Sequence, residues 1–409
     1  MANNPRQART VAILGAGCAG TLLAAELRRR RFSGRVELLD ARTDFVREQR
    51  WCFWRDGRET VPDLPISAEW LGWQVADQRQ SICHAAPSCV YSHVHAHEFF
   101  GRFHARLADD PQVGVRLGCR VLSVERRSGR TFRVQTSGGE LLADAVIDAR
   151  HEGAPSYERT IANVPGLLWQ TFRGRVVEFA IPCLNPATVT FMDFRVSMAG
   201  AGLAFVYVLP FTKTRALVEA VVLDCARADA PRLDAILEAY SEERFGGGGE
   251  ILAVEEGVLP MTSRSFMSRG TNHSLCLGVG GGAARPSSGY AFANILRAVR
   301  RTAGALCAGQ PQWQPRFAWK YRVLDALFLR LLRTDPAGAR HAFMAMFAGV
   351  EPARLVRFLT EASSLRDDLA VGFALPKAAF CKTVFLPRAG VIHSDRRFIP
   401  VIPHLLRRS

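Results

Sequence analysis

Residues 10–20 read TVAILGAGCAG, and this stretch decides the fold of the N-terminal part of the chain. An apolar run with strand character comes first, and three glycines follow it at the spacing of a dinucleotide-binding turn. Gly15 allows the tight turn, Gly17 lets the backbone approach a pyrophosphate, and Gly20 lets the next helix pack closely on the strand. The pyrophosphate is expected at the positive N-terminus of that helix.

The sequence after this turn supplies the context that a glycine motif needs. A helix-like segment covers residues 21–27, and a second apolar strand, residues 35–39, ends in Asp40. Asp40 stands 20 residues beyond Gly20, where an acidic side chain binds the ribose hydroxyls of the cofactor. Strand, turn, helix, strand and terminal acid together predict a Rossmann-like dinucleotide-binding domain.

Glu219 is a single carboxylate inside the apolar run ALVEAVVL, residues 216–223. Its β-branched residues and a turn at residues 210–214 indicate a buried strand. Two interpretations fit: the carboxylate pairs with one of the many arginines, or it stays partly protonated because burial disfavours its charged form. In the second case Glu219 is a candidate general acid. Asp193, on a nearby predicted strand, is the competing acid.

Length and composition limit the class of protein. With 409 residues and 48% hydrophobic content, two or three domains with a large core are expected. Ten cysteines without a CxxC pair favour reduced thiols in a cytosolic setting, and no metal site is expected. No apolar stretch reaches the ~18 residues of a membrane span.

The net charge of +15 comes mainly from arginine, since only four of the 53 basic residues are lysine. Attraction to anionic lipid is one explanation, and a general arginine bias of the genome is another. No nucleic-acid-binding module is recognisable, so nucleic acid is not an expected partner. Apolar stripes continue after residue 311, and basic residues accompany apolar ones at 369–386 and 398–406. These segments form either core or a basic amphipathic surface that lies on a bilayer.

The order of patterns predicts an α/β protein. Residues 115–125 are expected to form one strand, and a later strand ends in Asp148. A glycine-rich loop with Gly282, Pro286 and Gly289 precedes a helix; it either cradles a second part of the cofactor or is a simple turn. The expected parts are a first nucleotide-binding segment (1–150), a β-rich substrate domain (151–264), a nucleotide-binding return segment (265–310) and a helical, membrane-facing C-terminal region (311–409).

Short motifs are spread over most of the chain. In chain order they are GAGCAG (15–20), RWCFW (50–54), VIDAR (146–150), WQTF (169–172), FMDFR (191–195), FVYVLP (205–210), LVE (217–219), EGVLPM (256–261) and RPSSGY (285–290). Together they resemble the motifs of the bacterial lycopene cyclases, flavoproteins that form carotenoid rings. Several are individually weak, and their order and spacing carry the match. The LVE segment is similar to the one that carries the family's catalytic glutamate, but Ala220 stands where family members commonly have a second acid.

The resemblance implies an α/β flavoprotein: a Rossmann-like FAD-binding domain, an inserted β-sheet substrate domain and a helical C-terminal region. It implies that lycopene or a related carotenoid is cyclised to β-ionone rings without net oxidation or reduction. Reduced FAD would stabilise the cation, and NAD(P)H would serve only as reductant. The resemblance also implies a cytoplasmic protein that is attached peripherally to the inner face of the cell membrane. Family and sequence together assign Glu219 and Asp193 to catalysis, and Gly15, Gly17, Gly20, Asp40, Asp148, Gly282, Pro286 and Gly289 to FAD.

Other functions share parts of this pattern. A flavin monooxygenase usually has a Gly-Asp-Ala motif where this chain has LGVG, residues 277–280. A halogenase needs a tryptophan-rich signature and a lysine in a context that no lysine of this chain has. A reductase acting on an apolar isoprenoid is a further alternative. A non-catalytic carotenoid carrier is the non-enzyme alternative, and it leaves the buried Glu219 unexplained.

Overall fold

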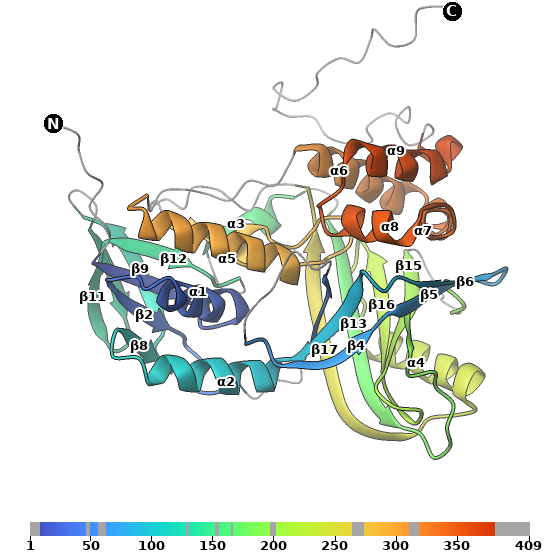
Figure 1. Cartoon of the computed structure of the whole chain (residues 1–409), viewed down its shortest axis with the longest axis horizontal. Coiled ribbons are helices and arrows are strands. Elements are labelled where there is room, and N and C mark those ends of the chain that lie inside the picture. The colour runs from blue at the N-terminus through green and yellow to red at the C-terminus, as the bar shows by residue number, and fades with distance from the viewer. Residues whose placement is uncertain are drawn as a thin grey trace, which may run out of the picture.

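We analysed a computed structural model, which describes residues 9–45, 50–55, 63–127, 131–151, 155–164, 167–196, 202–263, 274–310 and 319–380. Figure 1 shows two ends: one in which helices cover a sheet, and one built on long curved strands with a group of helices above them.

A five-stranded parallel sheet forms the centre of the first end. Its strands lie in the order β18 (Leu275–Cys276), β12 (Ala145–Asp148), β1 (Thr10–Leu14), β2 (Arg35–Leu39) and β8 (Val113–Arg116). One face packs against α1 (Cys18–Arg29), α2 (Ala96–Ala108) and α5 (Phe292–Cys307). The other face packs against an antiparallel sheet of β9 (Val121–Arg126), β10 (Phe132–Thr136) and β11 (Gly139–Ala143).

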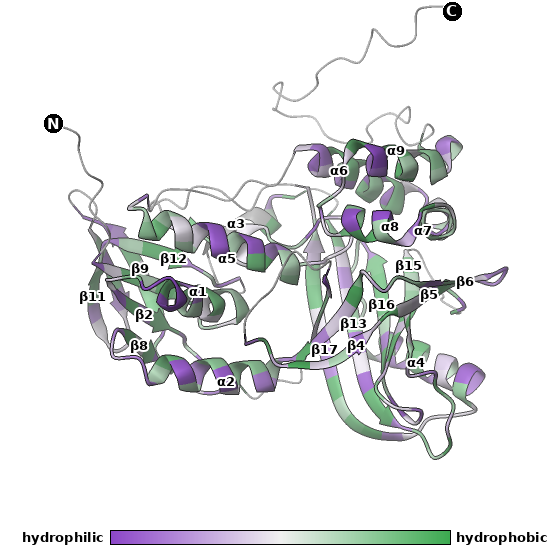
Figure 2. Cartoon of the chain, viewed as in Figure 1, coloured by the Kyte–Doolittle hydropathy of each residue, from purple (hydrophilic) through white to green (hydrophobic). Residues whose placement is uncertain are grey.

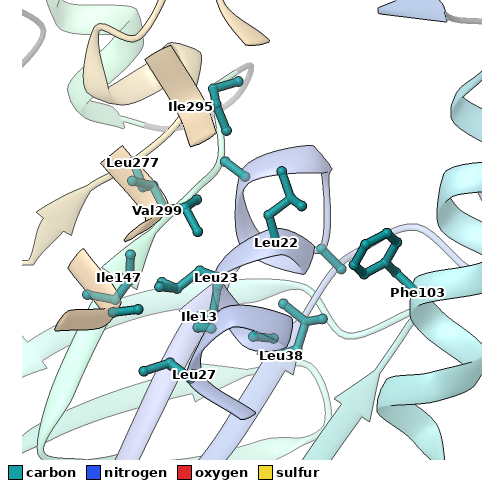
Figure 3. Close-up of a cluster of buried hydrophobic side chains, with 14 of the residues drawn as sticks. Ile13, Leu22, Leu23, Leu27, Leu38, Phe103, Ile147, Leu277, Ile295 and Val299 are labelled. Carbon is teal, nitrogen blue, oxygen red and sulfur yellow. The ribbon is translucent and has the colours of Figure 1, made fainter. Parts of the chain in front are cut away.

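Strand β1 shows why both faces are covered. Neighbouring side chains of a strand point to opposite faces, so Val11 and Ile13 enter the core under the helices while Ala12 and Leu14 enter the core under the small sheet. Figure 3 shows the first of these cores, in which Ile13 lies among leucines of α1 and Val299 of α5. A strand buried on both sides has to be apolar throughout, as this one is.

The prediction of a single strand over residues 115–125 is wrong. The structure has two strands there, β8 and β9, which belong to different sheets. The chain turns between them at Gly118, whose φ of +68° is in the left-handed region that favours glycine. The apolar residues on both sides of the turn hid this break from the sequence pattern.

A seven-stranded sheet forms the second end. Its order is β17 (Glu250–Met261), β13 (Leu168–Glu178), β16 (Arg215–Asp224), β15 (Leu203–Pro210), β14 (Thr188–Asp193), β5 (Gly72–Ala76) and β6 (Ser81–Ala85). Helix α4 (Ala230–Phe245) packs on one face, which we call the α4 face. The opposite face, which we call the pocket face, packs against β3 (Arg50–Arg55), β7 (Val90–His95) and the C-terminal helices. Hydrophobic and hydrophilic bands alternate along its long strands (Figure 2).

The expected boundaries need one adjustment, because β5 and β6 fall inside residues 1–150 yet pair into the seven-stranded sheet. Strands β3, β7 and β4 (Ile66–Trp70) form a separate three-stranded sheet beside it. Short elements complete the connections: α3 (Pro155–Ala162) and a 3-10 turn, Val279–Gly281.

Four helices above the pocket face form what we call the helical cap (Figure 1). They are α6 (Trp319–Thr334), α7 (Pro336–Gly349), α8 (Pro352–Leu359) and α9 (Leu365–Ala374). Across the described ranges no helix has the length and apolar character needed to cross a bilayer. The parallel sheet, the inserted sheet and the helical C-terminal part confirm the predicted α/β architecture.

Candidate active site

The turn between β1 and α1 has the geometry of a pyrophosphate site. Gly15 has a φ of +99°, and a Cβ on Gly20 would lie 1.9 Å from the carbonyl oxygen of Gly15. A Cβ on Gly17 would meet only Arg42 Nη2, at 3.6 Å, so the space in front of this turn is open. Gly17 caps α1 without a side-chain hydrogen bond, which leaves backbone N–H groups at the helix N-terminus for an anion.

Asp40 lies at the carboxyl end of β2, beside this turn. Its Oδ2 accepts a hydrogen bond of 2.8 Å from the backbone N–H of Ala16, and its carboxylate pairs with Arg42. Burial works to raise the pKa of Asp40, but the hydrogen bonds from Arg42 and Ala16 outweigh burial and hold it below its ordinary value. An ionised carboxylate in this position suits the ribose hydroxyls of a dinucleotide.

The predicted second cofactor segment lies close to the first. Asp148 ends β12, next to β1, and its carboxylate pairs with Arg150. A Cβ on Gly15 would lie 3.1 Å from Arg150 Cγ, so the two strand ends meet. Gly282, with a φ of +83°, follows the 3-10 turn that continues from β18. These residues gather at the carboxyl edge of the parallel sheet, where ligands of such folds bind.

The loop of residues 285–290, which we call the return loop, joins this edge to the pocket face. Pro286 and Gly289 lie in it, and a Cβ on Gly289 would lie 2.4 Å from Gln170 Oε1 on β13. Arg285, only 3% exposed, pairs with Asp325 of α6 and donates to the Phe358 carbonyl oxygen of α8. The return loop is therefore fixed both to the sheet and to the helical cap.

Glu219 lies in the middle of β16, on the pocket face. Its cross-strand partners are Tyr207 of β15 and Gly174 of β13. Gln170, which touches the return loop, is on the same face of β13 as Gly174 because an even number of residues separates them. Four residues of strand span about 13 Å. The structure thus brings Glu219 and the return loop onto one face of one sheet.

A second carboxylate, which no sequence pattern indicated, lies beside Glu219. Glu255 of β17 and Glu219 both pair with Gly174, one from each side. A Cβ on Gly174 would lie 3.2 Å from Glu255 Cγ and 3.3 Å from Glu219 Cβ, so the missing side chain makes room for both acids. Arg50 of β3 lies 3.4 Å from Glu255 Oε2, with both side chains nearly buried. Arg50 thus pairs with Glu255. Among the described residues Glu219 has no such arginine pair, in contrast to the interpretation in which it pairs with one.

Glu219 has the electrostatics of a protonated acid. Burial raises its pKa well above the ordinary value, and the charge of Glu255 raises it further, against a smaller opposite effect of Arg50. A carboxyl in such surroundings holds its proton near neutral pH. It can then donate the proton, as a general acid must.

Aromatic and hydroxyl groups surround this acid. Tyr207 and Tyr91 of β7 join their hydroxyls at 2.8 Å, and Phe191 lies beside both rings. The hydroxyl of Tyr290, at the end of the return loop, is buried beside that of Tyr91, and among the described atoms it makes no hydrogen bond of ordinary geometry. Burial raises the pKa of Cys52 to about 12, so its thiol stays neutral. The surroundings of Glu219 are largely apolar, with a few hydroxyls and the Glu255–Arg50 ion pair beside it.

Asp193, the competing acid, is not brought together with Glu219. It is fully buried on the α4 face, where it pairs with Arg195 and accepts from the Tyr240 hydroxyl at 2.9 Å. A β-bulge between Thr190 and Asp193 is the physical reason, because it shifts Asp193 into register with Val206. Without the bulge Asp193 would oppose Phe205, the residue before Val206, on the pocket face.

Ala220, where a second acid was noted to be missing, also faces α4. It packs in the core formed with that helix, as expected for the neighbour of a residue on the pocket face. An acid here would lie on the side of the sheet away from Glu219.

Comparison with known proteins places the chain in a family. The family model for "Lycopene cyclase protein" matches residues 10–384. A lycopene beta-cyclase from Pantoea ananas is 25% identical over 377 residues, covering 88% of this chain and 92% of the relative.

Solved structures of flavoproteins share the fold. A geranylgeranyl bacteriochlorophyll reductase-like protein from Thermoplasma acidophilum has a TM-score of 0.56 at 15% identity, over 92% of this chain and 96% of that one. A flavoprotein/dehydrogenase from Cytophaga hutchinsonii has the same TM-score at 12% identity, over 92% and 98%. At these identities the likeness extends to the fold alone, which is that of FAD-dependent flavoproteins.

Proposed function

This chain belongs to the lycopene cyclase protein family, and on that premise we propose that it is an FAD-dependent lycopene cyclase. The linear ends of lycopene become β-ionone rings in the proposed reaction, which gives γ-carotene and β-carotene. The observation that carries the proposal is Glu219, a carboxyl with a raised pKa in an aromatic site on the face that meets the return loop. Such a group is suited to protonate a carbon–carbon double bond.

Ring closure requires one proton to enter and another to leave. The Glu219 carboxyl donates its proton to the terminal double bond of the substrate, and the resulting cation closes a six-membered ring. The Glu219 carboxylate left by the first step takes up a different proton from the ring, which forms the ring double bond and restores the acid, so substrate and product are isomers. The rings of Tyr207, Tyr91 and Phe191 supply π faces that attract positive charge. Their apolar surroundings keep water from trapping the cation.

FAD is the proposed cofactor. The open turn at Gly17, the close helix approach at Gly20 and the ionised Asp40 suit its ADP half. Bound FAD in its reduced, anionic form supplies negative charge that stabilises the cation, with NAD(P)H needed only to reduce it. The proposed FAD-binding residues are Gly15, Gly17, Gly20, Asp40, Asp148, Gly282, Pro286 and Gly289.

A membrane is the proposed source of the substrate, because lycopene has no polar group. Leu365, Leu369 and Phe373 are 79%, 61% and 73% exposed, and their four-residue spacing puts them on one side of α9. Trp319 of α6 is 76% exposed, and Lys320 next to it bonds to Asp368 of α9, so the two helices adjoin. We call these four apolar residues the cap ridge. We propose that the ridge lies on the inner face of the cell membrane, as a peripheral contact. The tail at 398–406 is outside the described residues.

The decisive test supplies lycopene in liposomes to purified protein with dithionite-reduced FAD, without oxygen. Cyclised product should form with no stoichiometric oxidation of NAD(P)H, because an isomerisation consumes no electrons. A requirement for oxygen, or one nicotinamide oxidised per turnover, would instead indicate a monooxygenase or a reductase. A carrier would bind lycopene and leave it unchanged.

A further inference from the structure

Two acids on the pocket face are separated by a residue without a side chain. Glu219 and Glu255 approach Gly174 from opposite sides, and a Cβ on Gly174 would lie 3.3 Å from Glu219 Cβ and 3.2 Å from Glu255 Cγ. Glu255 is nearly buried, and burying an ionised carboxylate is costly unless a cation accompanies it. Arg50, with 7% of its side chain exposed, is that cation.

The other titratable groups around Glu219 are neutral at pH 7. Burial is the main cause of the raised pKa of Cys52 and of each nearby tyrosine. Within the described part of the chain, the elements packed here thus present one cation and one other carboxylate. By element, the groups facing Glu219 are Glu255 on β17, Arg50 and Cys52 on β3, Tyr207 on β15, Tyr91 on β7 and Tyr290 on the return loop.

We propose that Glu255 is a positioning residue that keeps Glu219 in its proton-donating form, by pairing with Arg50 and by presenting negative charge across Gly174. This inference rests on the proposed function, because it explains why Glu219 carries a proton before each ring closure. Glu255 itself transfers no proton in this scheme. Its effect on the reaction passes entirely through Glu219.

The proposal has a specific signature in the pH dependence of the rate. Protonated Glu219 is the active form, so the rate falls as pH rises through the raised pKa of Glu219. Glu255→Gln removes the like charge and leaves the Arg50 charge uncompensated by Glu255, and both changes lower that pKa. An opposite charge nearby lowers a carboxyl pKa by about 1–3 units. The alkaline limb of the pH–rate profile should therefore move to lower pH by about that amount, while the rate at low pH stays close to that of the unchanged protein.

Glu256→Gln is the matched control. Glu256 is the next residue of β17, faces the other side of the sheet and pairs with Arg173. The same chemical change there should leave the alkaline limb in place. The double variant Glu255→Gln with Arg50→Met removes the Arg50 cation as well, and it should bring the limb part of the way back.

The protonation of Glu219 should also be measured without substrate. Infrared spectra of the flavin-loaded full chain, taken against Glu219→Gln in the same flavin state, isolate the stretch of its protonated carboxyl at each pH. That band should persist at neutral pH in the unchanged protein and in Glu256→Gln, and be lost at lower pH in Glu255→Gln. This readout separates the two proposals, because it stands even where no ring is formed.

An unmoved limb and an unmoved infrared band in Glu255→Gln would overturn the inference. So would a loss of rate that is uniform across pH, which indicates a structural or proton-accepting role. Should Glu255→Gln fail to fold, the double variant is measured alone. A band in the double variant that matches the unchanged protein would then reject the contribution of the Glu255 charge.

Discussion

Gly174 illustrates how a residue can act by what it lacks. Any Cβ at this position would lie 2.9 Å from Leu217 Cδ1 and within 3.3 Å of both acids. Contacts that short force neighbours to shift in a close-packed interior. The glycine therefore fixes how close Glu219 and Glu255 lie to each other, although it carries no chemistry.

Glu219→Gln is the sharpest test at the scale of one residue. Glutamine keeps the shape of the side chain but has no proton to donate. Cyclisation should fall by at least the ~10²–10⁴-fold typical of general acid catalysis. Flavin content and lipid binding should be unchanged, as read from the flavin spectrum and liposome cosedimentation.

Asp193→Asn is the control for that variant, since Asp193 lies on the α4 face. Its loss should lower the melting temperature, because Arg195 and Tyr240 lose an anionic partner in a buried site. Its pH–rate profile should keep the alkaline limb of the unchanged protein. A fully active Glu219→Gln beside an inactive, well-folded Asp193→Asn would move the acid role to Asp193.

Among the elements, the β1–α1 turn allows folding and cofactor binding to be tested separately with two variants. Gly17→Val puts a side chain where the structure has only Arg42 Nη2 nearby, so the protein should fold and yet contain little flavin. Gly20→Ala makes a contact of 1.9 Å with the Gly15 carbonyl, so it should destabilise the domain itself. Absorbance and thermal melting measure the two effects. Normal FAD content in Gly17→Val would refute the assignment of this turn to the pyrophosphate.

Elements with local signals were predictable from the sequence, and contacts set by strand register were not. The glycine turn and Asp40 were predictable because they lie in one short segment, in which the spacing of the residues indicates the geometry. Glu255 meets Glu219 only because β13 stands between two strands that are distant in the chain. The face of Asp193 depends on a bulge, which alternation of residue types does not reveal.

For the whole molecule, the cap ridge should govern attachment to lipid. Burying one Leu or Phe side chain contributes roughly 1.5–3 kcal/mol, so Leu369→Ser with Phe373→Ser should weaken liposome binding by at least about tenfold. Ile181→Ser with Leu252→Ser removes exposed apolar residues outside the cap and should have little effect. Cosedimentation measures liposome binding by both variants.

The salt dependence of liposome binding tests the role of the basic residues. Binding should weaken as salt rises if basic residues add roughly 1 kcal/mol each. Equal binding to anionic and neutral liposomes at low salt would mean that the arginine excess is compositional.

Arg285 ties the helical cap to the return loop through buried contacts. If the ridge rests on lipid and the loop on flavin, two ligands of very different size share one structural connection. Thermodynamic reciprocity then applies: the factor by which liposomes tighten FAD binding equals the factor by which FAD tightens liposome binding. A bilayer would thus act as an effector of the flavin site, and a protein without flavin would be expected to leave the membrane more readily.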